Sequence, residues 1–112
     1  MARLKVTEVM FQQQVIDYAQ SVGWRCAHFR PARMKGKDGE EVWRTPVQAD
    51  GKGWPDLVMV RAGRQVVMEL KSDKGELSPD QQAWLEAFGQ CRDVEVYLCK
   101  PGDIAEIEEV LR

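Results

Sequence analysis

Two carboxylates and a lysine in the middle of the chain, Asp56, Glu69 and Lys71, are spaced so that one β-hairpin would bring them together. Apolar runs on either side of a glycine-containing turn predict two strands, over residues 57–60 and 65–70. With a two-residue turn, Asp56 lies directly opposite Glu69, with Cβ atoms roughly 5 Å apart. Because side chains alternate along a strand, Lys71 lies on the same face as Glu69.

Like charges that face each other across a sheet are destabilising, so the pair Asp56 and Glu69 requires an explanation. A divalent metal supplies one, since Mg²⁺ takes one or two carboxylates together with waters and phosphate oxygens. The backbone carbonyl of Leu70 would add another oxygen, and Lys71 would stabilise charge that develops on a phosphate. This combination indicates a phosphodiester-hydrolysis site. The alternative is a surface hairpin whose Glu69 and Lys71 simply face water.

The composition indicates one domain with a substantial core, since 44% of the 112 residues are hydrophobic and four are tryptophans. The net charge of −2 excludes a bulk polycation, so any nucleic-acid contact must come from a local patch. No apolar run approaches the roughly 18 residues of a transmembrane helix, and the N-terminus lacks a signal peptide. We therefore expect a cytoplasmic protein with no membrane partner. Three widely spaced cysteines and a single histidine argue against a zinc site or a disulfide framework.

The first predicted helix begins after Thr7, a suitable cap, and ends at Gly23. Its apolar stripe consists of Phe11, Val15, Tyr18, Ala19 and Val22. Glu8 falls at the N-terminal end of this stripe, with Gln12 one turn later. Glu8 either interacts favourably with the helix dipole or is an inward-facing acid that completes a metal site.

Residues 24–29 are predicted to form a strand. A long polar segment, residues 30–52, follows it, and within this segment only Glu41–Arg44 is predicted to be a short extended piece. We hypothesise that its basic residues contact phosphate backbones: Arg30, Arg33, Lys35, Lys37, Arg44 and Lys52. The alternative is a solvated loop whose charge is diluted by acidic neighbours. Trp43 or Trp54 would stack on an unpaired base, or would belong to the core.

Ser78 caps a second predicted helix, and Gln81 three residues later completes a capping box. The buried side of this helix is predicted to hold Ala83, Trp84, Leu85, Ala87 and Phe88. Residues 94–99 predict a last strand, and Asp103 with Glu106 predicts the cap of a third helix. The order α-β-β-β-α-β-α indicates an α/β fold, in which a small mixed sheet is flanked by helices.

Four stretches of this sequence resemble the PD-(D/E)XK nuclease superfamily, and more closely its VRR-NUC (virus-type replication-repair nuclease) family in the small stand-alone form typical of phages and prophages. They are Glu8-x-x-x-Gln12, Gly53-Trp54-Pro55-Asp56-Leu57, Glu69-Leu70-Lys71 and the helix that starts Leu77-Ser78-Pro79-Asp80-Gln81. The resemblance implies a restriction-endonuclease-like core and a single nuclease domain over residues 1–112.

The resemblance also implies a role for each matching residue. Asp56, Glu69 and the Leu70 carbonyl would hold Mg²⁺ or Mn²⁺, and Lys71 would be the catalytic lysine. Glu8 would be an accessory acid that touches the metal directly or through water. Gln81 would point into the site, although its capping-box role competes with this. The segment 30–52 has no counterpart in the family pattern.

Finally, the resemblance implies a metal-dependent endonuclease acting on DNA, particularly Holliday junctions or other branched DNA, in DNA repair or a phage-related process. We expect a homodimer, because two sites related by a two-fold axis would cut a symmetric junction symmetrically. One alternative is a non-catalytic DNA-binding or assembly module that keeps the nuclease fold. Another is a nuclease of the same superfamily that acts on duplex DNA, flap DNA or RNA.

Overall fold

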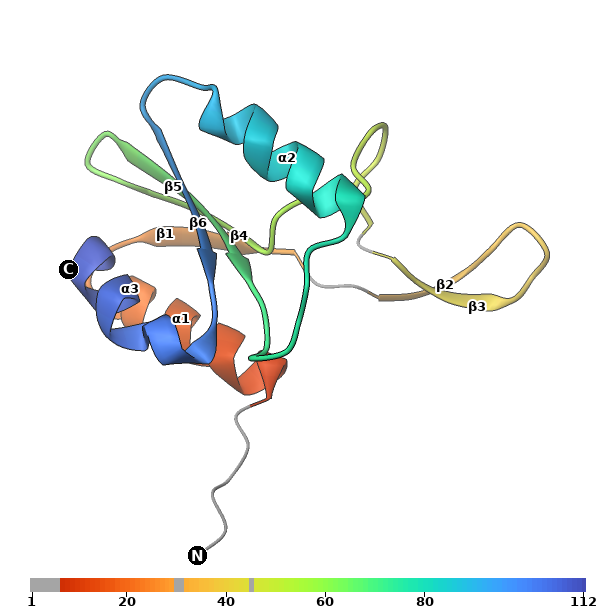
Figure 1. Cartoon of the computed structure of the whole chain (residues 1–112), viewed down its shortest axis with the longest axis horizontal. Coiled ribbons are helices and arrows are strands. Elements are labelled where there is room, and N and C mark those ends of the chain that lie inside the picture. The colour runs from red at the N-terminus through yellow and green to blue at the C-terminus, as the bar shows by residue number, and fades with distance from the viewer. Residues whose placement is uncertain (1–6, 30–31, 45) are drawn as a thin grey trace, which may run out of the picture.

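The structure is a computed structural model of the 112-residue chain, and it describes residues 7–29, 32–44 and 46–112. In that part of the chain the elements are, in order, α1 (Glu8–Ser21), β1 (Arg25–His28), β2 (Ala32–Lys35), β3 (Glu41–Arg44), β4 (Leu57–Arg61), β5 (Arg64–Leu70), α2 (Pro79–Gly89), β6 (Val94–Cys99), the 3₁₀ turn η1 (Pro101–Asp103) and α3 (Ile104–Leu111). Figure 1 shows their arrangement. None of the helices described is long and apolar enough to cross a membrane.

A four-stranded sheet in the order β1-β4-β5-β6 forms the centre of the fold. β4 pairs antiparallel with β1 and with β5, whereas β5 and β6 run parallel. The predicted mixed sheet flanked by helices is therefore confirmed. In the β4–β5 hairpin Leu57 lies opposite Met68 and Arg61 lies opposite Arg64, which is the register of a two-residue turn. Both turn residues, Ala62 and Gly63, have positive φ, as a tight hairpin turn requires.

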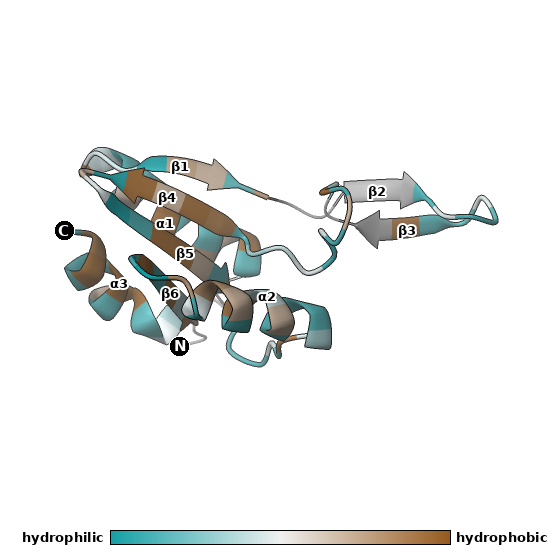
Figure 2. Ribbon diagram, turned by 90° about the horizontal axis from the view of Figure 1, so that it is seen from above, coloured by the Kyte–Doolittle hydropathy of each residue, from teal (hydrophilic) through white to brown (hydrophobic). Residues whose placement is uncertain are grey.

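One face of this sheet carries the core. Leu57 and Met59 of β4 alternate with more exposed neighbours, and both are fully buried against α1 and α3. From α1 and α3 the core receives Phe11, Val15, Ala19, Ile107 and Leu111. Each of these side chains except the smaller Ala19 contributes roughly 1.5–3 kcal/mol when it leaves water. Figure 2 shows the hydrophobic stretch running along the strands of the central sheet.

The opposite face of the sheet lies under α2, which packs against β6 and is separate from α1 and α3 (Figure 1). The prediction that five apolar residues of α2 form a buried side is wrong in its extent. No α2 residue is fully buried: Trp84, Leu85 and Phe88 are half-buried, and Ala83 and Ala87 are exposed. The pattern is right for Trp84, Leu85 and Phe88, which face inward, and wrong for the two alanines.

The segment predicted as irregular contains a second, two-stranded sheet formed by β2 and β3. Its turn is closed by hydrogen bonds from the Gly36 amide to the Glu40 carbonyl, 2.7 Å, and from the Gly39 amide to the Gly36 carbonyl, 3.0 Å. Figures 1 and 2 show this hairpin extending away from the central sheet. The sequence pattern predicts only residues 41–44 to be extended. The glycine-rich turn between residues 35 and 41 is the sequence signal that they pair with residues 32–35.

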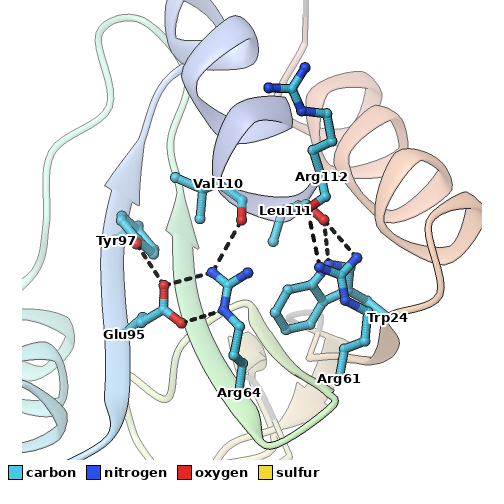
Figure 3. A network of polar contacts seen from close by, with 8 residues as sticks. All are labelled: Trp24, Arg61, Arg64, Glu95, Tyr97, Val110, Leu111 and Arg112. Atoms are coloured by element: carbon cyan, nitrogen blue, oxygen red, sulfur yellow. Dashed lines mark hydrogen bonds and ion pairs between the residues drawn. The ribbon is translucent and has the colours of Figure 1, made fainter.

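Two arginines, one on each side of the β4–β5 turn, bind groups at the ends of α1 and α3 and on β6 (Figure 3). The Arg61 guanidinium donates to the carbonyls of Val22, 2.8 Å, and Leu111, 2.9 Å. Arg64 donates to both carboxylate oxygens of Glu95 at 2.8 Å. Both guanidiniums lie over the Trp24 ring, with Cζ atoms 4.6 and 5.0 Å from its centroid. The network joins the last turns of α1 and α3 to the β4–β5 turn.

The start of α3 differs from the prediction. Asp103 does not cap this helix with its side chain. Its carboxylate instead accepts a hydrogen bond from the Lys100 amide at 2.8 Å and closes the 3₁₀ turn η1. Asp103 does stand at the N-cap position of α3, but its carboxylate is engaged in η1 and does not cap the helix.

Candidate active site

Asp56 is positioned by the loop that enters β4. Gly53 has φ +84°, and a Cβ atom there would lie 2.5 Å from the carbonyl carbon of Asp80 and 2.6 Å from the amide nitrogen of Gln81. Only glycine therefore allows this loop to approach the first turn of α2 so closely. The Asp56 carbonyl also accepts a hydrogen bond from the Phe29 amide at 2.8 Å, which ties the loop to the end of β1.

The β4–β5 pairing ends with Leu57 opposite Met68, so Asp56 and Glu69 are the next residues at this end of the hairpin. One oxygen of the Asp56 carboxylate, Oδ2, accepts a hydrogen bond from the Leu70 amide at 2.8 Å. Lys71 directly follows the end of β5, and its ammonium lies 3.8 Å from Oε1 of Glu69. The structure therefore brings the three predicted residues of the hairpin together.

The two oxygens of the Glu69 carboxylate have different surroundings. Glu69 is 1% exposed. Oε1 accepts a hydrogen bond from the side-chain nitrogen of Gln81, Nε2, at 3.3 Å and lies beside the Lys71 ammonium. Oε2 is buried and has no hydrogen-bond partner among the residues that the structure describes. A buried carboxylate oxygen without a partner is costly, so this atom is suited to a ligand that is bound during function.

The electrostatics of the site favour a proton on Glu69 when no metal is bound. Burial and then the negative charge of Asp56 raise the pKa of Glu69 to about 9, while the nearby Lys71 ammonium opposes this rise. A divalent cation between the two carboxylates would replace the proton. Strongly perturbed acids of this kind are characteristic of functional sites.

Glu8, an exposed residue in the first turn of α1, interacts electrostatically with the same site. Partial burial and then the charge of Asp56 raise the pKa of Glu8, and the Lys71 ammonium lowers it. Glu8 thus lies within electrostatic range of both residues. Thr7 caps the helix as predicted, because its hydroxyl accepts from the Met10 amide at 3.1 Å. Gln12, one turn further on, is buried.

Gln81 carries both of the roles that the sequence left in competition. Its side-chain oxygen accepts a hydrogen bond from the Ser78 amide at 2.9 Å, and its own amide donates to the Ser78 hydroxyl at 3.2 Å. The capping box at the start of α2 is therefore confirmed. At the same time the Gln81 side-chain nitrogen points to Glu69.

Among the basic residues of segment 30–52 whose side chains the structure describes, none forms an ion pair with Asp56 or Glu69. Arg30 lies outside the described residues, and of Arg33 and Arg44 the structure describes only the backbone, in β2 and β3. Lys35 and Lys37 are exposed at the tip of the β2–β3 hairpin, which points away from the central sheet (Figure 1). Lys52 lies close to α2, where its ammonium is 3.4 Å from the Asp80 carboxylate.

The tryptophans near the site belong to an aromatic cluster. Trp54 packs edge-on against Phe29, Trp84 and Phe88, with ring centroids 5.7, 4.9 and 5.4 Å apart. The Trp84 indole donates to the carbonyls of Asp50, 3.0 Å, and Lys52, 3.1 Å. These contacts fasten the loop before Asp56 to α2, a function of Trp84 that we did not predict. For Trp43 the structure describes only the backbone, in β3.

The residues present fit a hard divalent cation. Asp56 and Glu69 supply two carboxylates, one with a free buried oxygen, and the Leu70 carbonyl lies between Glu69 and Lys71 in the chain. Among the described residues, no group of three or more His, Cys, Asp or Glu side chains is arranged to hold a metal. The remaining ligands would therefore be the backbone carbonyl, waters and substrate oxygens, which is the usual manner of Mg²⁺.

Comparison of the sequence with models of protein families finds a match to one family. The model of the VRR-NUC domain matches residues 31–101, more than half of the chain. The match includes Asp56, Glu69, Lys71 and Gln81, and it also covers the β2–β3 hairpin, for which the sequence had suggested no family counterpart. Glu8 lies before it. No curated protein matches this chain.

Proposed function

We propose that this chain, which belongs to the VRR-NUC family of nucleases, is an endonuclease that hydrolyses DNA phosphodiester bonds with the help of Mg²⁺ or Mn²⁺. The observation that carries the proposal is the environment of Glu69. Its carboxylate is buried opposite Asp56 and beside Lys71, and one of its oxygens has no partner in the described part of the chain. A hairpin with only a structural role would not keep such a group away from water.

Each residue of the site has a separate task in this proposal. Asp56, Glu69 and the Leu70 carbonyl would hold the cation, which when bound lowers the pKa of a water and offsets charge on the scissile phosphate. Lys71 keeps its ammonium at the site and is only 14% exposed, so that it stabilises negative charge on the phosphate in a partly dehydrated setting. Glu8 adds negative charge at the edge of the site, where it would orient water bound to the cation.

We further propose that the substrate is branched DNA and that the enzyme acts as a homodimer. The resemblance of the sequence to the small VRR-NUC form supports this, as do two exposed apolar residues of the central sheet. Val60 is 45% and Leu98 47% exposed, and Leu98 pairs with Glu69 across β5 and β6. A two-fold partner would cover such residues and present two sites to one junction. The same proposal assigns the enzyme to a phage or prophage and to the host cytoplasm.

The deciding experiment is a cleavage assay on matched Holliday-junction, flap, single-stranded and duplex DNA, with Mg²⁺, Mn²⁺ or chelator. Wild type is compared with Glu69→Gln, which keeps the size of the side chain. Paired, metal-dependent nicks in the junction, absent in the variant, support the full proposal. Cleavage of flap or duplex DNA alone would retain the nuclease and remove the junction preference. Sedimentation with and without the junction tests the dimer.

A second candidate function is a DNA-binding module without catalysis. The observation in its favour is that the described residues hold no cluster of three metal-binding side chains. Calorimetric titration with Mn²⁺ separates the two functions. Absence of binding at the carboxylates, together with DNA binding that is insensitive to chelator, would favour the module.

A further inference from the structure

The first turn of α2 is held together by two hydrogen bonds between Ser78 and Gln81, one in each direction. The Ser78 hydroxyl accepts from the Gln81 amide, 3.2 Å, and the Gln81 side-chain oxygen accepts from the Ser78 amide, 2.9 Å. Ser78 itself is extended, with φ −74° and ψ 161°. The helix cap therefore fixes the Gln81 side chain as well as the helix end.

This arrangement determines which way the Gln81 amide faces. A backbone N–H can only donate, so the side-chain oxygen of Gln81 must be the atom that faces Ser78. The NH₂ group then faces Oε1 of Glu69, at 3.3 Å. The reversed amide would place two donors together at Ser78 and two acceptors together at Glu69, which would lose both hydrogen bonds.

Oε1 of Glu69 is thereby occupied from two sides, by the Gln81 NH₂ group and by the Lys71 ammonium at 3.8 Å. Oε2 has no partner among the residues that the structure describes, and it is buried. The contact with α2 therefore makes the two oxygens of the Glu69 carboxylate different: Oε1 is hydrogen-bonded, and Oε2 is left for a ligand.

We propose that Ser78 and Gln81 are positioning residues that hold the Glu69 carboxylate so that Oε2 remains available to the divalent cation. The inference rests on the proposed metal-dependent function. In it, neither residue touches the reacting atoms: the Ser78 amide orients Gln81, and Gln81 orients Glu69. The close approach of Gly53 to the Gln81 amide keeps the loop of Asp56 in register with the same turn.

The test is calorimetric titration of the whole chain with Mn²⁺ alone, in the absence of DNA. Gln81→Met keeps the volume of the side chain but removes the amide, and it should weaken Mn²⁺ binding about 10- to 100-fold, as loss of a partner of a metal ligand does. Thermal unfolding of each variant, followed by circular dichroism, shows that the variant is folded at the temperature of the titration.

Two substitutions of Ser78 separate positioning from capping. Ser78→Ala removes the hydroxyl cap but keeps the amide that orients Gln81, so it should lower the melting temperature and leave the Kd for Mn²⁺ close to that of wild type. Ser78→Pro also removes the amide, and the observed φ of −74° accommodates proline. It should weaken Mn²⁺ binding to the same extent as Gln81→Met.

Glu69→Gln distinguishes failure of this inference from failure of the proposed function. If wild type binds Mn²⁺ and Glu69→Gln does not, while Gln81→Met and Ser78→Pro bind like wild type, the positioning role is overturned and the metal site stands. If wild type itself binds no Mn²⁺, the metal-dependent function is overturned, and the inference is overturned with it. Equal weakening by Ser78→Ala and Ser78→Pro would also overturn it, because capping alone would then explain the effect.

Discussion

The Asp56 carboxylate accepts a hydrogen bond from the Leu70 amide at 2.8 Å, across the β4–β5 hairpin. Leu70 stands between Glu69 and Lys71 in the chain, so this bond fixes Asp56 relative to both. It uses Oδ2 and leaves the negative charge of the carboxylate at the site. The bond therefore joins the stability of the hairpin to the geometry of the candidate metal ligands.

Asp56→Asn tests whether the charge or the hydrogen bond of this residue matters for function. The asparagine oxygen still accepts from the Leu70 amide, so we expect the fold and the melting temperature to be retained. Loss of an anionic metal ligand should reduce DNA cleavage more than about 100-fold, since even partners of such ligands contribute 10- to 100-fold. Cleavage assays and circular dichroism measure the two effects. Cleavage near the wild-type rate would exclude Asp56 as a metal ligand.

Lys71→Met is expected to separate catalysis from metal binding. The ammonium lies 3.8 Å from Glu69, and its removal takes away stabilisation of charge on the phosphate, which should slow cleavage about 10²- to 10³-fold. Mn²⁺ should still bind, but only at higher pH than in wild type, because Lys71 opposes the rise in the pKa of Glu69. Single-turnover cleavage and calorimetry at several pH values test this. Unchanged cleavage would remove Lys71 from the mechanism.

The hairpin and its charged residues could be predicted from sequence because the register of a two-residue turn is a local property. Alternation and turn length alone place Asp56 opposite Glu69 and put Lys71 on the same face. The capping box of Ser78 and Gln81 is likewise local. For these residues, short-range rules determine the geometry.

Contacts between distant segments could not be predicted in the same way. The hydrogen bond from Gln81 to Glu69 depends on where α2 crosses the sheet, which is set by the contact of Gly53 with the first turn of that helix. The incomplete burial of α2 depends on what else covers the same face. The pairing of β2 with β3 was missed because charged residues and glycines conceal the apolar alternation on which strand prediction relies.

The stability of the metal-free protein should fall as pH rises, through Glu69. Its pKa is raised from 4.5 to about 9 in the folded chain. Between these values the folded state holds a proton that the unfolded state has lost, so the free energy of unfolding decreases with pH, by up to about 1.4 kcal/mol per pH unit. Urea unfolding in chelator between about pH 5 and pH 8 measures the slope.

Glu69→Gln is the control for this slope. It cannot ionise, so the variant should be more stable than wild type at neutral pH and should show a flatter pH dependence. Saturating Mn²⁺ should restore stability in wild type and not in the variant, since a ligand that binds the folded state stabilises it by mass action. An equal slope in both proteins would show that another group is responsible.

Arg61→Ala should destabilise the fold without affecting the site. The guanidinium satisfies carbonyls at the ends of α1 and α3 and lies over the Trp24 ring (Figure 3). Hydrogen bonds from charged donors contribute about 1.5–3 kcal/mol each, so we expect a loss of at least that size in urea unfolding. Arg25→Ala, on the exposed neighbouring strand, should change stability by no more than about 0.5 kcal/mol. Equal effects of the two substitutions would contradict the role of Arg61 at the helix ends.

Gly53→Ala and Gly63→Ala form a matched pair, because both glycines have φ near +80°, +84° and +82° respectively. A Cβ at Gly63 meets nothing within 4 Å, so alanine there costs only the left-handed conformation, about 1–2 kcal/mol. A Cβ at Gly53 would come within 2.7 Å of backbone and side-chain atoms of Asp80 and Gln81, and must displace the loop from α2. Gly53→Ala should therefore be the more destabilising of the two in urea unfolding. It should also weaken Mn²⁺ binding, because Asp56 moves with the loop. Equal losses of stability, with unchanged Mn²⁺ binding, would show that the contact between this loop and α2 does not set the geometry of the site.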